Sequence, residues 1–192
     1  MITTELIKEL RDKTGVSIMQ CKKALEETNG DMDKALIVLH KKSGEIAAKK
    51  GDRDLGSGAV GMYLHASGTV GSMILLQSET DFVSKNEEFR TLARDIAMHV
   101  AATAPTYLKN ADIPDDAKAT AREVFAKEAE GKPADMIEKI IEGKMQAYFK
   151  EKVLLEQSFI KNPEVTIQGL IDQAVQKFGE RVEVAQFVRF SA

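Results

Sequence analysis

The stretch Val60-Gly-Met-Tyr-Leu-His-Ala-Ser-Gly-Thr-Val-Gly-Ser-Met-Ile-Leu-Leu76 decides the fold class of this chain of 192 residues. Two apolar runs, Val60–His65 and Val70–Leu76, flank a short polar segment with a glycine, which is typical of a hairpin turn. The pattern predicts two antiparallel strands with apolar side chains on both faces. We expect Val60, Met62 and Leu64 on one face, and Tyr63, Met73, Leu75 and Phe187 on the other.

Helical patterns follow the hairpin, and an apolar run ends the chain. Apolar residues recur at helical spacing in the segments 89–100, 115–130, 136–149 and 167–178. The run Val182–Phe190 predicts a third strand that joins the hairpin. Residues 55–192 are therefore expected to form an α+β core, a three-stranded antiparallel sheet packed with helices.

The two apolar faces of this sheet cannot both be covered in the same way. The predicted helices can cover one face, and an antiparallel sheet with a solvated face usually shows cleaner polar alternation. The second face is expected to be a subunit interface that forms a homodimer. Cover by loops or by the N-terminal residues is the alternative.

Residues 1–54 have the pattern of three short helices. Gly15 ends the first, Ser17-Ile-Met-Gln20 forms a capping box for the second, and Asn29-Gly30 ends it. Asp31 can cap the third helix. A compact three-helix bundle with short connections is predicted.

Two features of the second helix concern function. Cys21, the one cysteine of the chain, is expected to be a small core residue and not a nucleophile, since no histidine lies near it in the sequence. Ile18 and Met19 open the helix beside a loop. Core packing is the default interpretation of this pair. The alternative is that the two side chains are exposed and form an apolar contact with a partner.

The segment Lys41–Arg53 is the most basic part of the chain, with Lys41, Lys42, Lys49, Lys50 and Arg53. It has no aromatic residues for stacking on bases, so a solvated linker or helix face is preferred over an RNA-binding patch. Gly56-Ser-Gly-Ala-Val-Gly61 then matches a dinucleotide-binding pattern. The pattern leads into a strand and not into a helix, so no helix N-terminus is available for a pyrophosphate.

The polar segment Ser78-Glu-Thr-Asp-Phe-Val-Ser-Lys-Asn86 joins the second strand to the next helix. Asn86, or Ser84 together with Glu87, can cap that helix. Phe82 has two possible roles at such a turn. It can pack back on its own helix as a hydrophobic staple, or it can project as an anchor for a partner.

The rest of the chain shows no catalytic pattern. His40, His65 and His99 fall on separate elements without ligand spacing, and acidic pairs lie at predicted helix starts. We therefore expect no enzyme activity, no metal and no cofactor. Apolar residues make up 43%, charged residues 30%, and the net charge is −3. Together with a single cysteine and no long apolar run, these values predict a cytoplasmic protein that binds neither membrane nor nucleic acid directly.

Several motifs closely resemble those of the translation elongation factor Ts family. They are Leu10-Arg-Asp-Lys-Thr-Gly15, Cys21-Lys-Lys-Ala-Leu25, Gly30-Asp31, Thr80-Asp-Phe-Val83 and the ending Phe187-Val-Arg-Phe190. They occur in the family's order and spacing, and the resemblance covers essentially the whole chain. It implies a guanine nucleotide exchange factor for elongation factor Tu, with a ubiquitin-associated-like N-terminal module.

The resemblance also implies roles for individual residues. In the family an Asp-Phe pair, here Asp81 and Phe82 between Thr80 and Val83, enters the nucleotide domain of elongation factor Tu. There the Phe wedges between two helices and disturbs the magnesium and phosphate environment. The N-terminal module grips the same domain through positions that correspond to Arg11, Ile18 and Met19.

The chain departs from the family pattern at a few positions. Ser17 and Ile18-Met-Gln20 stand where Gly and Met-Met-Asp are common, and Ser84 replaces a commoner Ala. The chain lacks the C-terminal cysteine of some short members, which argues against a disulfide between subunits. We recognise neither the second core half nor the coiled-coil insertion of longer members. An RNA-associated module that uses Lys41–Arg53 remains the alternative function.

Overall fold

The computed structural model describes residues 2–192, apart from the side chains of residues 134 and 135, and begins with three helices. They are α1 (Thr4–Thr14), α2 (Ile18–Glu27) and α3 (Met32–Ala48). Their ends follow local chemistry: the Asp31 side chain accepts from the Lys34 N–H, and Gly15 ends α1 with φ 67°. The module has a core of its own, built on Leu10, Cys21, Leu25, Ala35 and Leu39.

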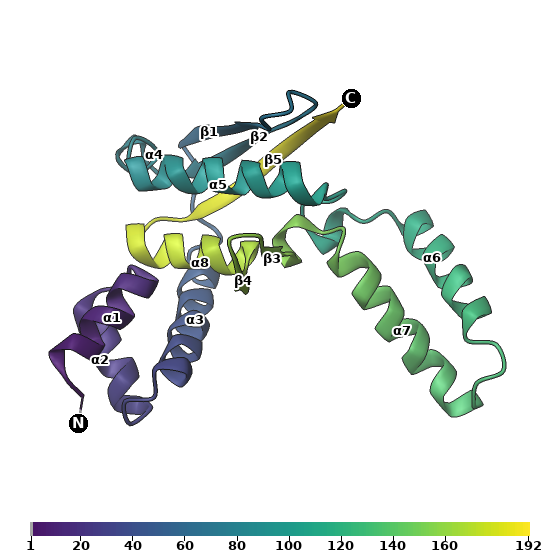
Figure 1. Ribbon diagram of the computed structural model, residues 1–192, viewed down its shortest axis with the longest axis horizontal. Coiled ribbons are helices and arrows are strands. Elements are labelled where there is room, and N and C mark those ends of the chain that lie inside the picture. The colour runs from purple at the N-terminus through teal and green to yellow at the C-terminus, as the bar shows by residue number, and fades with distance from the viewer. Residues whose placement is uncertain (1) are drawn as a thin grey trace.

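Within residues 2–192, a three-stranded antiparallel sheet in the order β1-β2-β5 forms the centre of the fold. Its strands are β1 (Ser57–Leu64), β2 (Val70–Ser78) and β5 (Val182–Ser191). Helix α5 (Glu87–Thr103) lies across one face of this sheet (Figure 1). The predicted α+β fold, with an N-terminal three-helix unit and a helix-packed sheet, is confirmed.

The close approach of α5 to the sheet depends on Gly61 in β1. A Cβ atom at this position would lie 2.2 Å from the carbonyl oxygen of Ala93 on α5, a distance that no side chain can occupy. Gly56-Ser-Gly-Ala-Val-Gly61 therefore leads into a strand, as expected. Its last glycine serves helix packing and not a phosphate.

Helix α8 (Ile167–Phe178) connects the N-terminal module to the core. It packs along α3, and Gln173 Nε2 lies 3.0 Å from His40 Nε2 at this contact. Helix α3 runs to Ala48, so Lys41 and Lys42 lie in a helix. Only the end of the basic segment Lys41–Arg53 is a loop. The division of the chain at residue 54 stays a prediction.

Two further helices, α6 (Asp115–Glu128) and α7 (Ala134–Lys150), pair and project from the core as an arm (Figure 1). Ion pairs Arg122–Glu138 and Lys144–Glu128 join them along their length. Both helices were expected as part of the core, and the structure places them as a pair that projects from it. Local patterns describe each helix but not the pairing of one with the other.

Some short elements complete the core and were not predicted. A small two-stranded sheet forms from β3 (Ser158–Phe159) and β4 (Asn162–Thr166). Short 3-10 turns, η1 (Asn110–Asp112) and η2 (Leu154–Glu156), lie on either side of the arm in the sequence. Segments of two to five residues are too short to show a period, which is why sequence patterns missed them.

The predicted distribution of apolar side chains over the two sheet faces was wrong in part. In the register of the hairpin, Val60 pairs with Leu75 and Met62 with Met73, and paired residues share a face. Met73 and Leu75 therefore lie on the same face as Val60, Met62 and Leu64. Tyr63 pairs with Ser72, and Phe187 pairs with Ile74, on the face that α5 covers. The turn length sets this register, and alternation within one strand cannot reveal it.

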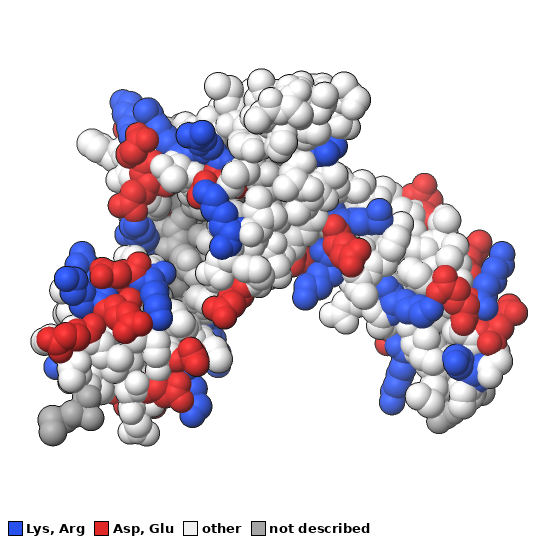
Figure 2. All heavy atoms as spheres, viewed as in Figure 1, with Lys and Arg blue, Asp and Glu red and all other residues white. Residues whose placement is uncertain are grey.

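The second face of the sheet is open and apolar. Helix α5 leaves it uncovered, and Met62 on β1 is 70% exposed. Figure 2 shows few charged side chains over the β1–β2 hairpin and the end of β5. We call this surface the open face; its exposed apolar residues are Val60, Met62, Leu64, Met73, Val188 and Phe190.

Candidate functional site

Phe82 projects from a short helix, α4 (Asp81–Ser84), between the end of β2 and the start of α5. Its side chain is 87% exposed, so it does not pack on the following helix. The staple interpretation is therefore wrong, and the exposed aromatic has the geometry of an anchor. Asn86 caps α5 through a bond from the Glu88 N–H, one of the two caps expected for this helix.

The residues after Phe82 attach α4 to the core. Val83 is only 8% exposed and belongs to the main apolar cluster with Ile74 and Phe89. The Ser84 hydroxyl lies 2.7 Å from the hydroxyl of Ser57 on β1. Val83 thus supports the projecting residues from below, and the exposed part of the predicted motif is Thr80, Asp81 and Phe82. We call these three residues the tip.

Asp81 is a charged member of the tip. Lys85 Nζ donates to Asp81 Oδ2 at 2.7 Å, and this hydrogen bond and the Lys85 charge hold the pKa of Asp81 below its usual range. The carboxylate is therefore ionised at neutral pH. Charged side chains of both signs gather on the surface around α4 (Figure 2).

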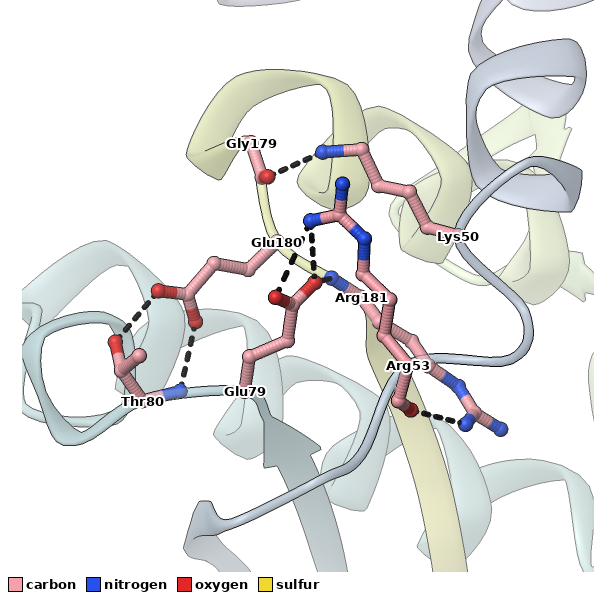
Figure 3. Close-up of polar contacts among 7 residues, drawn as sticks. All are labelled: Lys50, Arg53, Glu79, Thr80, Gly179, Glu180 and Arg181. Carbon is pink, nitrogen blue, oxygen red and sulfur yellow. Dashed lines mark hydrogen bonds and ion pairs between the residues drawn. The ribbon is translucent and has the colours of Figure 1, made fainter.

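The base of the tip is joined to the segment that follows α8 (Figure 3). Glu180 Oε2 accepts from the Thr80 N–H at 3.0 Å, and Glu180 Oε1 accepts from the Thr80 hydroxyl at 2.5 Å. In return, Glu79 Oε1 accepts from the Arg181 N–H at 2.6 Å. Arg53 also pairs with Glu79, at 3.1 Å. Sequence reasoning did not find Glu180, because no local pattern links positions so far apart in the chain.

Ile18 and Met19 form a second exposed apolar site. They are 58% and 69% exposed at the start of α2, because Cys21, Ala24 and Leu25 already complete its buried face. The core-packing interpretation of this pair is wrong. Arg11, the third residue expected to contact a partner in this module, is exposed in the last turn of α1.

The start of α2 deviates from the predicted capping box in one contact. The Ser17 hydroxyl accepts from the Gln20 N–H at 3.4 Å, as expected. The Gln20 side chain accepts from the Ser17 hydroxyl instead of from the backbone, and it also accepts from Gln176 Nε2 at 3.2 Å. Gln20 therefore fixes the start of α2 to the end of α8.

The end of α8 brings the two exposed sites to neighbouring parts of the molecule. Lys177 forms an ion pair with Glu88 in the first turn of α5, directly after the tip. The same lysine also reaches the loop before α2, since a Cβ at Gly15 would lie 3.4 Å from Lys177 Nζ. Lys177 thus links the first turn of α5 to the loop before α2.

Several lysine and arginine side chains of the segment Lys41–Arg53 bind to other residues of the same molecule. Lys42 pairs with Glu27 at 2.7 Å, Arg53 pairs with Glu79, and Lys50 donates to the Gly179 carbonyl. A patch for RNA needs cations that are free to meet phosphates. These contacts favour the structural role of this segment.

The single cysteine has the surroundings of a core residue. Cys21 is fully buried, and burial raises the pKa of its thiol, which opposes the reactive thiolate. Among the residues whose side chains the structure describes, no group of three or more His, Cys, Asp or Glu is placed to hold a metal ion. None of the helices described is long and apolar enough to cross a membrane.

An exposed aromatic tip and an exposed apolar helix start, each attached to a buried cluster, have the geometry that is typical of docking sites for a partner. Comparison with known families agrees, because the family described as Elongation factor TS matches residues 2–192. The chain belongs to the elongation factor Ts family. This membership links it to translation elongation and guanine nucleotide exchange.

Curated relatives cover nearly the full chain. Elongation factor Ts of Thermodesulfovibrio yellowstonii is 47% identical over 190 residues, 98% of this chain and 95% of the relative. That of Carboxydothermus hydrogenoformans is 46% identical over 192 residues, 99% of this chain and 88% of the relative. That of Thermosipho melanesiensis is 44% identical over 193 residues, with 100% and 98% coverage.

Proposed function

We propose that this chain binds elongation factor Tu and accelerates the release of GDP from it, and that Asp81 and Phe82 enter the nucleotide domain of that partner. The observation that carries the proposal is the 87% exposure of Phe82 on a helix turn that Val83 and Ser84 attach to the core. A large apolar side chain exposed on a rigid base is typical of an interface anchor. Family membership names the partner.

The N-terminal module supplies the second contact in this proposal. Ile18 and Met19 offer an apolar pair for a groove on the partner, and Arg11, exposed on α1, adds a cation to the same module. Two separate contacts let the module hold the partner while the tip acts on the nucleotide site. The proposed division of labour is partner docking by residues 1–54 and tip presentation by residues 55–192.

Exchange of this kind needs no reactive side chain. If the chain binds the nucleotide-free partner more tightly than the GDP-bound partner, linkage requires that it weaken GDP binding by the same factor. Burial of one Phe side chain contributes about 2 kcal/mol, which corresponds to a change of about 30-fold in an equilibrium constant. Incoming GTP then displaces the chain by the same linkage.

The open face supports a further part of the proposal, a homodimer. Its apolar residues lie on neighbouring strands in register, and a second copy of the chain would remove them from water. The cytoplasm, where translation takes place, is the proposed location of the exchange reaction.

Release of a fluorescent GDP analogue from elongation factor Tu tests this function. We expect the chain to raise the release rate in a saturable manner, and to bind nucleotide-free partner more tightly than partner in excess GDP. The same release rate with and without the chain would reject the proposal. Strongly salt-dependent binding of RNA by the chain alone would favour the alternative module.

A further inference from the structure

We propose that Glu180 is a positioning residue for nucleotide exchange, which holds the tip in the geometry for insertion through its two bonds to Thr80. The inference rests on the proposed function and assigns to it a residue outside the tip and the N-terminal module. It starts from the size of α4, which has four residues. So short a helix does not persist by itself, and its surroundings must impose its shape.

Thr80 is the N-cap residue of α4 but does not cap it. Its side chain makes no hydrogen bond to the N–H groups of the helix. The hydroxyl donates to Glu180 Oε1 at 2.5 Å and the N–H of the same residue donates to Glu180 Oε2 at 3.0 Å (Figure 3). Both donors of Thr80 are thus held by one carboxylate, and charge strengthens both bonds.

The chain on either side of Glu180 is itself held in place. Gly179 ends α8 with φ 73°, a conformation that turns the chain toward the tip, and its carbonyl accepts from Lys50. The next residue, Arg181, donates its N–H to Glu79 and its guanidinium to the Arg53 carbonyl at 2.6 Å. Glu180 is therefore fixed on both sides.

The loop before α4 and the loop after α8 each provide one glutamate that accepts hydrogen bonds from the other loop. The two glutamates hold different parts of the loop before α4. Glu79 accepts from the backbone of Arg181 and fixes the base of the loop. Glu180 accepts from Thr80, two residues before Phe82, and so controls the backbone that sets the direction of the aromatic ring. Val83 and Ser84 hold the other end of α4. Without Glu180, both donors of Thr80 would lose their partner. The N-terminal side of the tip would keep only the contacts of Glu79 and the bond from the Ser78 hydroxyl to the Thr80 carbonyl at 2.9 Å.

Loss of this contact should change the rate of exchange more than the binding of the partner. The Ile18–Met19 pair docks independently of Thr80, so the concentration of factor at half-maximal effect should change little. The maximal rate of GDP release should fall, because a tip that samples several directions is only part of the time in position to insert. A misplaced group costs on the order of tenfold or more in rate.

The test compares Glu180→Gln with matched variants in the GDP-release assay. Glu180→Gln replaces one acceptor oxygen by a donor at the same size, and we expect the maximal release rate to fall about tenfold. Thr80→Val, which removes the hydroxyl, should show a similar loss, and Thr80→Ser should keep the wild-type rate. Glu183→Gln, a nearby carboxylate that pairs with Arg181, is the control and should keep the wild-type rate.

Two results would overturn the inference. One is a wild-type maximal rate for Glu180→Gln. The other is an equal loss for Thr80→Ser and Thr80→Val. The double variant Glu180→Gln, Thr80→Val should be no slower than the slower single variant, since both remove the same contact.

Hydrogen exchange of the Thr80 amide separates this inference from the proposed function. We expect a protected amide in the wild type and faster exchange in Glu180→Gln, both measured without the partner. If the wild type accelerates GDP release and Glu180→Gln matches it, only the role of Glu180 fails. If the amide behaves as expected but the wild type does not accelerate release, the proposed function fails and the contact has no role in exchange.

Discussion

Phe82 and Val83 are consecutive residues whose side chains have opposite surroundings, 87% exposed and 8% exposed. One turn of helix accounts for the contrast, since it directs Val83 into the core and Phe82 to solvent. Burial of the Val83 side chain therefore stabilises the fold. The Phe82 side chain is exposed in the free protein, so the free energy of its burial can contribute to the binding of a partner.

Replacement of Phe82 by Ala should separate activity from stability. The side chain makes few contacts in the free protein, so the free energy of unfolding should change by less than about 0.5 kcal/mol. Acceleration of GDP release should fall about 30-fold, because about 2 kcal/mol of apolar burial is lost in the complex. Val124→Ala, an exposed apolar residue on α6, is the control and should leave the release rate unchanged. Undiminished exchange by Phe82→Ala would reject insertion of the ring.

Replacement of Met19 by Ala tests the second contact. We expect the affinity for nucleotide-free elongation factor Tu to fall about tenfold, the usual effect of truncating an interface anchor. Calorimetric titration measures it directly. Ile37→Ala, an exposed residue on α3 of the same module, provides the comparison and should bind like the wild type. Equal affinities for all three proteins would remove Met19 from the interface.

A charge within the open face should prevent dimer formation. Met62 on β1 pairs with Met73 on the central strand, which in turn pairs with Val188, so Met62 belongs to a row of apolar residues that crosses this surface. Met62→Glu would bury a carboxylate without a partner, at a cost of several kcal/mol. Sedimentation analysis should show a dimer for the wild type and a monomer for the variant. Met136→Glu on α7 should stay dimeric, and a monomeric wild type would reject the dimer.

Replacement of Gly61 by Ala should lower the free energy of unfolding, whereas replacement of Gly143 by Ala should raise it. Gly61→Ala forces a methyl group against the Ala93 carbonyl, 2.2 Å away, and should lower the free energy of unfolding by about 3 kcal/mol. Gly143 lies inside α7 with open space around its Cβ position, so Gly143→Ala should raise stability by about 0.5–1 kcal/mol. Urea unfolding of both variants provides the measurement. A neutral Gly61→Ala would show that α5 can move away from the sheet.

The stability of the fold should depend on pH through His99. This residue is fully buried, its Nδ1 accepts from the Ile160 N–H at 3.3 Å, and its Nε2 donates to Gln157 at 2.9 Å. Burial lowers its pKa in the folded state. Above about pH 6.5, the usual pKa of unfolded histidine, both states are neutral and stability is at its full value.

As the pH falls below about 6.5, His99 becomes protonated in the unfolded state but stays neutral in the folded state, where its pKa is lower. Stability should therefore fall between about pH 6.5 and the lowered folded pKa, by up to about 1.4 kcal/mol per pH unit. His99→Gln should be less stable at neutral pH but should lose less on acidification over this range. Equal slopes for the wild type and His99→Gln would contradict this origin.

Much of the secondary structure could be predicted, because it depends on neighbouring residues. Asp31 and Asn86 start helices as expected, and Gly15 and Gly179 end them in the left-handed conformation. The hairpin also followed from its turn and its apolar runs. Only short pieces such as β3 were missed, since two residues carry no period.

The site was less predictable than the elements that carry it. Residue types alone favoured core packing for Ile18 and Met19 and a staple for Phe82, because large apolar residues usually lie inside. The family resemblance reversed this order and implied partner contacts for all three. Glu180 gave no signal at all. Its bonds to Thr80 join segments 100 residues apart, and only the packing of α8 against the sheet brings them together.

The sequence by itself determined the order of helices and strands, the family and the chemical identity of the tip, since each depends on residue type and local spacing. The tertiary structure decided which sheet face stays open, that Phe82 faces solvent, and that Glu180 holds Thr80. These properties depend on strand register and on contacts between distant segments. Neither is encoded in a local pattern, because both are settled only when the whole chain packs.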